Sequence, residues 1–170
     1  MSLKYLVFIT LLLMTFRVSG QTKTITGKII DQNLLTVYQA HIYTSDTSLS
    51  VLTDIKGYFI ATVPIATKSL VIHAVGMEPK NIELEEGCDT IEIILLYAGT
   101  YDFMTPRKVD RLRKKQFARL PELHQSAFKQ SIFEKEQPCY TDRFISFREE
   151  IKKMKTSAVT PKTKQDQAQQ

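Results

Sequence analysis

Several residue types and patterns that indicate a catalytic or metal-binding protein are missing from this 170-residue chain. It contains no tryptophan, two cysteines and three histidines. It has no H-x-x-x-H or C-x-x-C spacing, so the short ligand pairs of common zinc and redox sites are absent from it. It also has no G-x-S-x-G element and no EF-hand spacing. The sequence therefore predicts a protein that is not an enzyme and needs no cofactor or metal ion.

Glycine and proline are also scarce, with six of each, which excludes collagen-like and low-complexity chains. The net charge of +5 is distributed unevenly along the chain. Residues 21–100 carry 5 basic and 9 acidic residues, whereas residues 101–170 carry 16 basic and 9 acidic residues. This change of sign predicts a module at 21–98 and a basic extension at 99–155. The polar tail, 156–170, is expected to be disordered.

No apolar run is long enough to cross a membrane. The longest, Tyr5–Phe16, has 12 residues, whereas a spanning helix needs about 20. A basic residue precedes it and small residues follow at 18–20, which is the secretory signal pattern. We expect residues 1–20 to be a signal peptide and the mature chain to begin at Gln21, without a transmembrane segment. An uncleaved anchor and a short buried helix are the alternatives.

Seven short apolar segments follow at strand-like spacing, with no helical period between them. They lie at 24–30, 40–44, 49–53, 58–63, 69–75, 81–84 and 90–96. Asp54 to Gly57 is a turn signal that calls for positive φ at Gly57, and Gly76 marks another turn. The spacing predicts a seven-stranded antiparallel β-sandwich, so the class is mainly β with a helical extension.

Four blocks of these strands carry a family resemblance. They are Gly27–Asp31, Ala40–Tyr43, the T-D-x-x-G-x-F motif at Thr53–Phe59, and Leu70–Gly76. They resemble the carboxypeptidase regulatory-like domain, a transthyretin-like β-sandwich, over about residues 23–97. Departures from the family pattern occur at Tyr38-Gln39, His73 and Met77.

The resemblance implies a non-catalytic domain, of the kind found beside peptidases or at the start of TonB-dependent outer-membrane receptors. We therefore expect an exported binding or scaffold protein of the gram-negative envelope, in the periplasm or at the outer-membrane periphery, as an accessory to a receptor system. One alternative is an orphaned receptor-associated domain that docks a membrane protein. Another is a small carbohydrate-binding protein or envelope hydrolase with a cleft between sandwich and helices.

The extension is predicted to form two or three basic helices. Thr105-Pro106 can begin the first, Pro121 the second and Thr141-Asp142 the third. The candidate partner-binding residues are Arg107, Arg111, Arg113, Lys114, Lys115 and Arg119 on the first helix, and Phe144 and Phe147 on the third. This basic cluster either contacts an envelope protein or an anionic surface, or is a solvated helix face. Because the chain is expected to be exported, nucleic acid is not an expected partner.

The remaining candidate residues have structural interpretations. Cys88 and Cys139 are the only thiols, and they form a bridge, stay free or pair between molecules. Three histidines lie in different predicted elements, and His73 is expected to be a hydrogen-bonded core or sheet residue. The three aspartates beside predicted turns, Asp31, Asp54 and Asp89, are expected to bond their own backbone rather than a cation.

Overall fold

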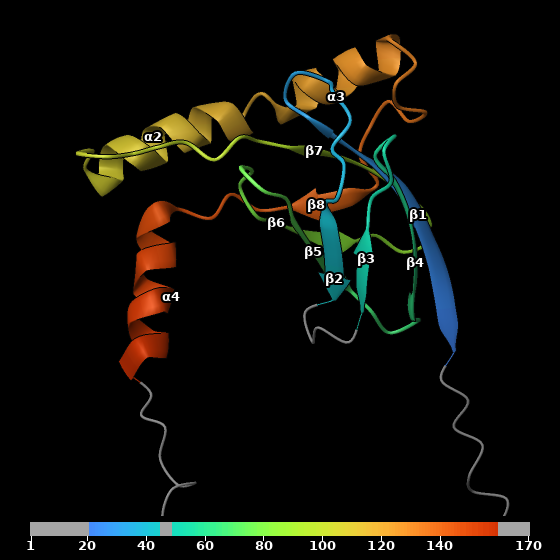
Figure 1. Cartoon of the computed structure of the whole chain (residues 1–170), viewed down its shortest axis with the longest axis horizontal. Coiled ribbons are helices and arrows are strands. Elements are labelled where there is room, and N and C mark those ends of the chain that lie inside the picture. Colours follow the sequence, from blue (N-terminus) through green and yellow to red (C-terminus); the bar gives the residue numbers. More distant parts are fainter. Residues whose placement is uncertain (1–20, 45–48, 160–170) are drawn as a thin grey trace, which may run out of the picture.

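The computed structural model describes residues 21–44 and 49–159, which form a β-sandwich with helices packed beside it (Figure 1). One sheet has three strands in the order β4–β1–β7, and the other has five in the order β3–β2–β5–β6–β8. The strands are β1 (Thr22–Asp31), β2 (His41–Thr44), β3 (Ser50–Leu52), β4 (Tyr58–Pro64), β5 (Ser69–His73), β6 (Lys80–Leu84), β7 (Thr90–Leu95) and β8 (Tyr140–Asp142). The helices are α2 (Pro106–Phe117), α3 (Leu120–Lys129) and α4 (Phe147–Val159).

All seven segments expected to be strands form strands, but the sandwich is not wholly antiparallel. β1 pairs with β4 antiparallel and with β7 parallel. Parallel neighbours need a long connection between them, and the chain between β1 and β7 supplies it by building most of the other sheet. The prediction of an all-antiparallel sandwich was therefore wrong at this one pairing.

An eighth strand comes from the extension. β8 pairs antiparallel with β6, with Tyr140 opposite Leu84 and Asp142 opposite Ile82. The expectation that Thr141-Asp142 would cap a helix was wrong, because these residues hydrogen-bond along the edge of β6 instead. The helix begins later, at Phe147.

Two hydrophobic cores hold the layers together. The larger lies between the sheets and includes Ile25, Ile29, Ile42, Phe59, Leu70, Ile72, Ile82 and Ile93, all nearly inaccessible to solvent. The smaller joins the outer face of the three-stranded sheet to α3 through Ile30, Ile94, Ala127 and Phe133. β7 is therefore buried on both faces, and each fully buried large side chain contributes about 1.5–3 kcal/mol.

The T-D-x-x-G-x-F motif forms a tight connection. Thr53 is buried, and its hydroxyl donates to the Val37 carbonyl and accepts from the Ala40 amide. The Asp54 carboxylate accepts from two amides across the turn. Gly57 has φ of 77°, which confirms the predicted positive φ.

Two predictions concern the ends of the chain. The expected signal peptide, residues 1–20, lies outside the described residues, as does 160–170 of the expected disordered tail. Residues 156–159, in contrast, form the end of α4, so the expectation of disorder was wrong for that part of the tail.

Candidate interaction surface and adjoining cavity

Helices α2 and α3 form one bent helix along one side of the sandwich (Figure 1). α2 begins as predicted, with Thr105 at the N-cap position and Pro106 at the first helical position, although the Thr105 side chain makes no capping hydrogen bond. The bend lies at Ala118 and Arg119. Pro121, near the start of α3, has no amide hydrogen with which to continue the ladder of α2.

Six basic side chains of α2 and its C-terminal end form one exposed surface, which we call the cationic face. They are Arg107, Lys108, Arg111, Lys114, Lys115 and Arg119. At 3.6 residues per turn they span an arc of about 140°. The buried residues of the helix, Val109 and Arg113, point to the opposite side. None of the six forms an ion pair with any residue in the described part of the chain.

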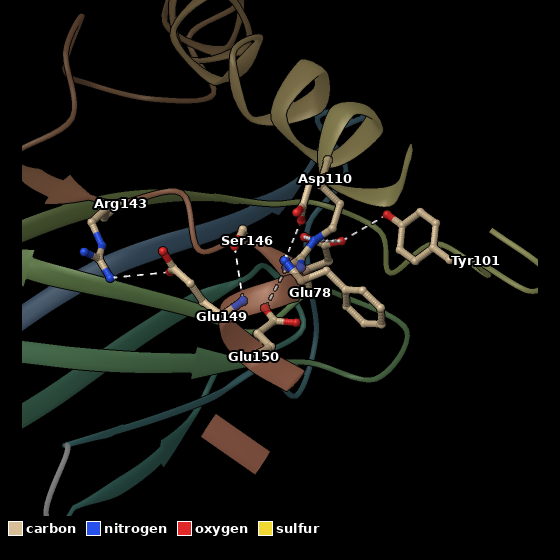
Figure 2. A network of polar contacts seen from close by, with 9 residues as sticks. Glu78, Tyr101, Asp110, Arg143, Ser146, Glu149 and Glu150 are labelled. Atoms are coloured by element: carbon tan, nitrogen blue, oxygen red, sulfur yellow. Dashed lines mark hydrogen bonds and ion pairs between the residues drawn. The ribbon is translucent and has the colours of Figure 1, made fainter. Parts of the chain in front are cut away.

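Arg113 does not belong to the cationic face. It is 8% exposed, and its guanidinium lies 3.0 Å from Glu78 and 2.9 Å from Glu150. Tyr101 donates a hydrogen bond of 3.3 Å to the same Glu78 (Figure 2). Burial alone would lower the pKa of Arg113, but Glu150 and Glu78 outweigh it and raise the pKa above its ordinary value. Arg113 thus joins α2, α4 and the segment before β6.

The two aromatic candidates, Phe144 and Phe147, lie against α2. The Phe144 ring packs edge-on to Phe117, with centroids 5.7 Å apart. The Phe147 amide donates to the Asp110 carboxylate at 2.6 Å, so a residue of α2 caps the first turn of α4. Both side chains are half-buried. They therefore do not extend the cationic face as a free aromatic stripe.

The segment after α3 is tied to β7 and to the turn before it. Cys88 and Cys139 form a disulfide with their Cα atoms 5.9 Å apart, which is the bridged alternative that the sequence left open. Glu92 is 5% exposed, and its carboxylate accepts from the amides of Glu134 and Lys135 at 2.6 and 3.0 Å. A buried carboxylate needs such partners to offset its desolvation. The extension is thus joined to the sandwich through Arg113 on α2 and again through residues 134–139, after α3.

A cavity of about 410 Å³ lies where β6 and β8 meet the bend between α2 and α3, and we call it the junction cavity. Its lining is Lys80, Ile94, Phe117, Ala118, Leu120, Pro121, His124, Gln125, Glu136, Gln137, Pro138, Tyr140 and Asp142. A smaller cavity of about 70 Å³ shares Lys80, Phe117 and Asp142 with it and reaches Arg113.

Lys80 is the central polar group of this wall. Its ammonium lies 2.7 Å from the Asp142 carboxylate, donates to the Ile94 carbonyl at 3.2 Å, and lies 5.3 Å from the centre of the Tyr140 ring. Burial opposes the charged form, but Tyr140 and Asp142 outweigh it, so the pKa of Lys80 is raised. Burial also raises the pKa of Tyr140. At neutral pH the wall therefore holds the Lys80 ammonium, paired with Asp142, and the un-ionised phenol of Tyr140.

The histidines do not form one group. His124 is 3% exposed; its Nε2 lies 3.1 Å from the Lys135 carbonyl, and burial lowers its pKa. His73 is exposed at the end of β5, so it is a sheet residue but not a core residue, and His41 lies opposite it on β2. Within the described residues no three His, Cys, Asp or Glu side chains gather as a metal site.

The aspartates behave as turn residues where they make side-chain contacts. Asp31 is buried; its carboxylate accepts from the Asn33 and Leu35 amides at 2.8 and 2.9 Å, and Tyr97 donates to it as well. This hydrogen bond to Asp31 raises the pKa of Tyr97. Asp89 lies exposed just before β7.

The sequence reasoning missed Lys80, Glu92, Tyr140 and Asp142. Glu92 did carry a signal, because a charged residue inside an apolar run needs a buried partner. Three-residue β8 carried none, because it is too short to show strand alternation.

Comparison with known proteins does not assign the chain to a family. No known protein family matches the chain, and no curated protein shows significant similarity to it. Among the described residues, no helix has both the length and the apolar character that a membrane crossing requires.

Proposed function

We propose that this chain is an exported, non-catalytic binding protein of the gram-negative cell envelope that holds an acidic partner protein on its cationic face. In this proposal the sandwich is a carboxypeptidase regulatory-like domain that supports the extension, and the extension selects the partner. The protein would act in the periplasm or at the outer-membrane periphery, as an accessory to a receptor system.

The observation that carries the proposal is the contrast within one helix. Arg113 faces inward and is fully paired, whereas the six residues of the cationic face have no acidic partner in the described part of the chain. Arg113 ties α2 to the sandwich and Ala127 packs α3 against it, so the bent helix presents these charges in one geometry and little backbone freedom is lost on binding. Basic surfaces of this kind steer association with acidic partners, and that association is sensitive to salt.

The disulfide supports the exported location. Disulfides persist in oxidising compartments and are rare in the cytosol. Cys88 and Cys139, which are 51 residues apart in sequence, join the sandwich to the extension.

The test is charge reversal with a matched control. We expect Arg111→Glu/Lys114→Glu/Lys115→Glu to recover at least tenfold less partner than wild type from cross-linked envelope fractions at low salt. The control, Lys56→Glu/Lys68→Glu/Lys129→Glu, makes the same change in net charge at exposed positions away from the cationic face, and it should capture partners as wild type does.

Sedimentation with lipid vesicles distinguishes an anionic lipid surface from an acidic protein as the partner. Binding of the wild type to phosphatidylglycerol vesicles, with no captured acidic protein, would replace the protein partner by an anionic lipid surface. Equal capture by both triple variants would contradict the proposal.

A further inference from the structure

The junction cavity shares no lining residue with the cationic face. Its volume of about 410 Å³ lies within the range of small-molecule sites, about 300–1,000 Å³. It lies between elements that are fixed to one another, because β8 pairs with β6 and the disulfide holds the adjoining residue. Figure 1 shows β6 and β8 beneath the bend between α2 and α3. We propose that this cavity binds a neutral polyhydroxylated ligand of the size of a mono- or disaccharide.

The charges of the wall exclude most other ligands. Lys80 and Asp142 face one another at 2.7 Å, so each is neutralised by the other. An anionic ligand would have to displace Asp142 from Lys80 and would meet Glu136 nearby in the lining. A cationic ligand would lie against the Lys80 ammonium, and Glu136, the carboxylate of the lining outside this pair, is exposed to water. Neither ligand would gain a free opposite charge in the buried part of the wall to offset the hydration that it loses.

The wall contains both hydrogen-bond donors and hydrogen-bond acceptors. Lys80 only donates and the Asp142 carboxylate only accepts, whereas Gln125 does both. His124 also lines the cavity; its Nε2 faces the Lys135 carbonyl and donates to it, which leaves Nδ1 as the acceptor of the neutral ring. A hydroxyl group donates and accepts at once. A ligand with several hydroxyls therefore matches this wall without carrying charge.

The rest of the lining is apolar and partly aromatic. Phe117 and Tyr140 contribute rings, and Ile94, Leu120 and two prolines contribute aliphatic surface. Sugar rings present a hydrophobic C–H face together with polar edges. Burial of that face against such rings supplies affinity, and the polar groups fix orientation, which is the usual division in small-molecule sites.

Saturation-transfer NMR on the full chain tests the site with glucose, galactose, N-acetylglucosamine and maltose as neutral probes. Glucuronate and glucosamine are the charged probes. We expect at least one neutral sugar to bind with a dissociation constant of about 1 mM or tighter, and both charged probes to bind at least tenfold more weakly. Binding of no neutral sugar, or equal binding of a charged probe, would overturn the proposal.

Cavity-blocking variants then locate the binding. Gln125 and Ala118 line the cavity and are exposed, so Gln125→Trp and Ala118→Trp obstruct it without disturbing either core. Lys129→Trp places the same side chain on α3 away from the lining and is the matched control. We expect the two blocking variants to lose at least tenfold in affinity and the control to match wild type. Undiminished binding by both blocking variants would place the sugar elsewhere and overturn the assignment. The charge-reversed triple variant should still bind the sugar, so this proposal and the partner proposal fail separately.

Discussion

Single residues fix the shape of the connection between β3 and β4. The backbone at Gly57 approaches β1 so closely that a Cβ atom there would lie 2.5 Å from the Ile29 carbonyl oxygen. Gly76 has nearly the same φ, 75°, yet a Cβ atom there would meet nothing within 4 Å. The sequence motif predicted the positive φ at Gly57 but not this contact, because the contact is with a strand about thirty residues earlier.

These two glycines allow a matched prediction. Gly76→Ala should lower the free energy of unfolding by about 1 kcal/mol, the cost of a left-handed backbone conformation. Gly57→Ala carries the same cost and must also move a strand, so we expect a loss of about 3 kcal/mol. Urea unfolding of both variants checks the difference. Equal losses would show that the approach of Gly57 to β1 is not tight.

His124 predicts a pH dependence of stability. Burial lowers its pKa in the folded chain below the ordinary value of about 6.5. The unfolded chain therefore binds the proton more readily, and the folded state loses stability as the pH falls below about 6.5. We expect the fall in melting temperature between pH 7.5 and pH 5 to be smaller in His124→Gln than in wild type. The exposed His41→Gln should behave as wild type, and an identical fall in all three proteins would contradict the assignment.

At the scale of elements, local sequence patterns predicted individual helices and strands well. The proline at the start of α2 and the apolar alternation of β4 predicted those elements closely. β8 and the parallel pairing of β1 with β7 were not predictable in this way. Both depend on which strand edges are left open once the sheets have formed, which is a property of tertiary structure.

Arg113 tests how α2 and α4 are joined. Arg113→Met removes the partner of Glu78 and Glu150 and leaves both carboxylates under the helix, so we expect a loss of about 2–4 kcal/mol. Arg111→Met, two residues away on the cationic face, should change stability by less than about 0.5 kcal/mol. Thermal unfolding of the two variants gives the comparison. Equal melting temperatures would mean that the network in Figure 2 does not hold the helices.

For the whole molecule, the sequence predicted two modules from charge and a sandwich from strand spacing. It placed the cationic cluster on the extension, but helical spacing alone did not distinguish inward Arg113 from the outward residues. A cleft between sandwich and helices was one alternative from the sequence, but the residues that line the junction cavity were not predictable, because Lys80, His124 and Asp142 come from three separate elements. Only their packing brings these groups to one wall.

The disulfide gives a prediction for the stability of the whole chain. Replacing both Cys88 and Cys139 by Ala opens a loop with a sequence separation of 51 residues. In the chain-entropy description this costs about 4 kcal/mol at 25 °C. We expect the urea midpoint of the double variant to fall accordingly. An unchanged midpoint would indicate that the other contacts of the extension are sufficient by themselves.

The pairing of β8 with β6 also has a consequence during synthesis. Until residue 142 has left the ribosome, the edge of β6 and the outer faces of Ile30 and Ile94 lack their cover. Unpaired edges and bare apolar faces attract other chains. A nascent or truncated product ending near residue 98 would therefore be prone to aggregate, although it contains every strand of the resembled domain. Anyone who expresses this sandwich should keep the chain through α4.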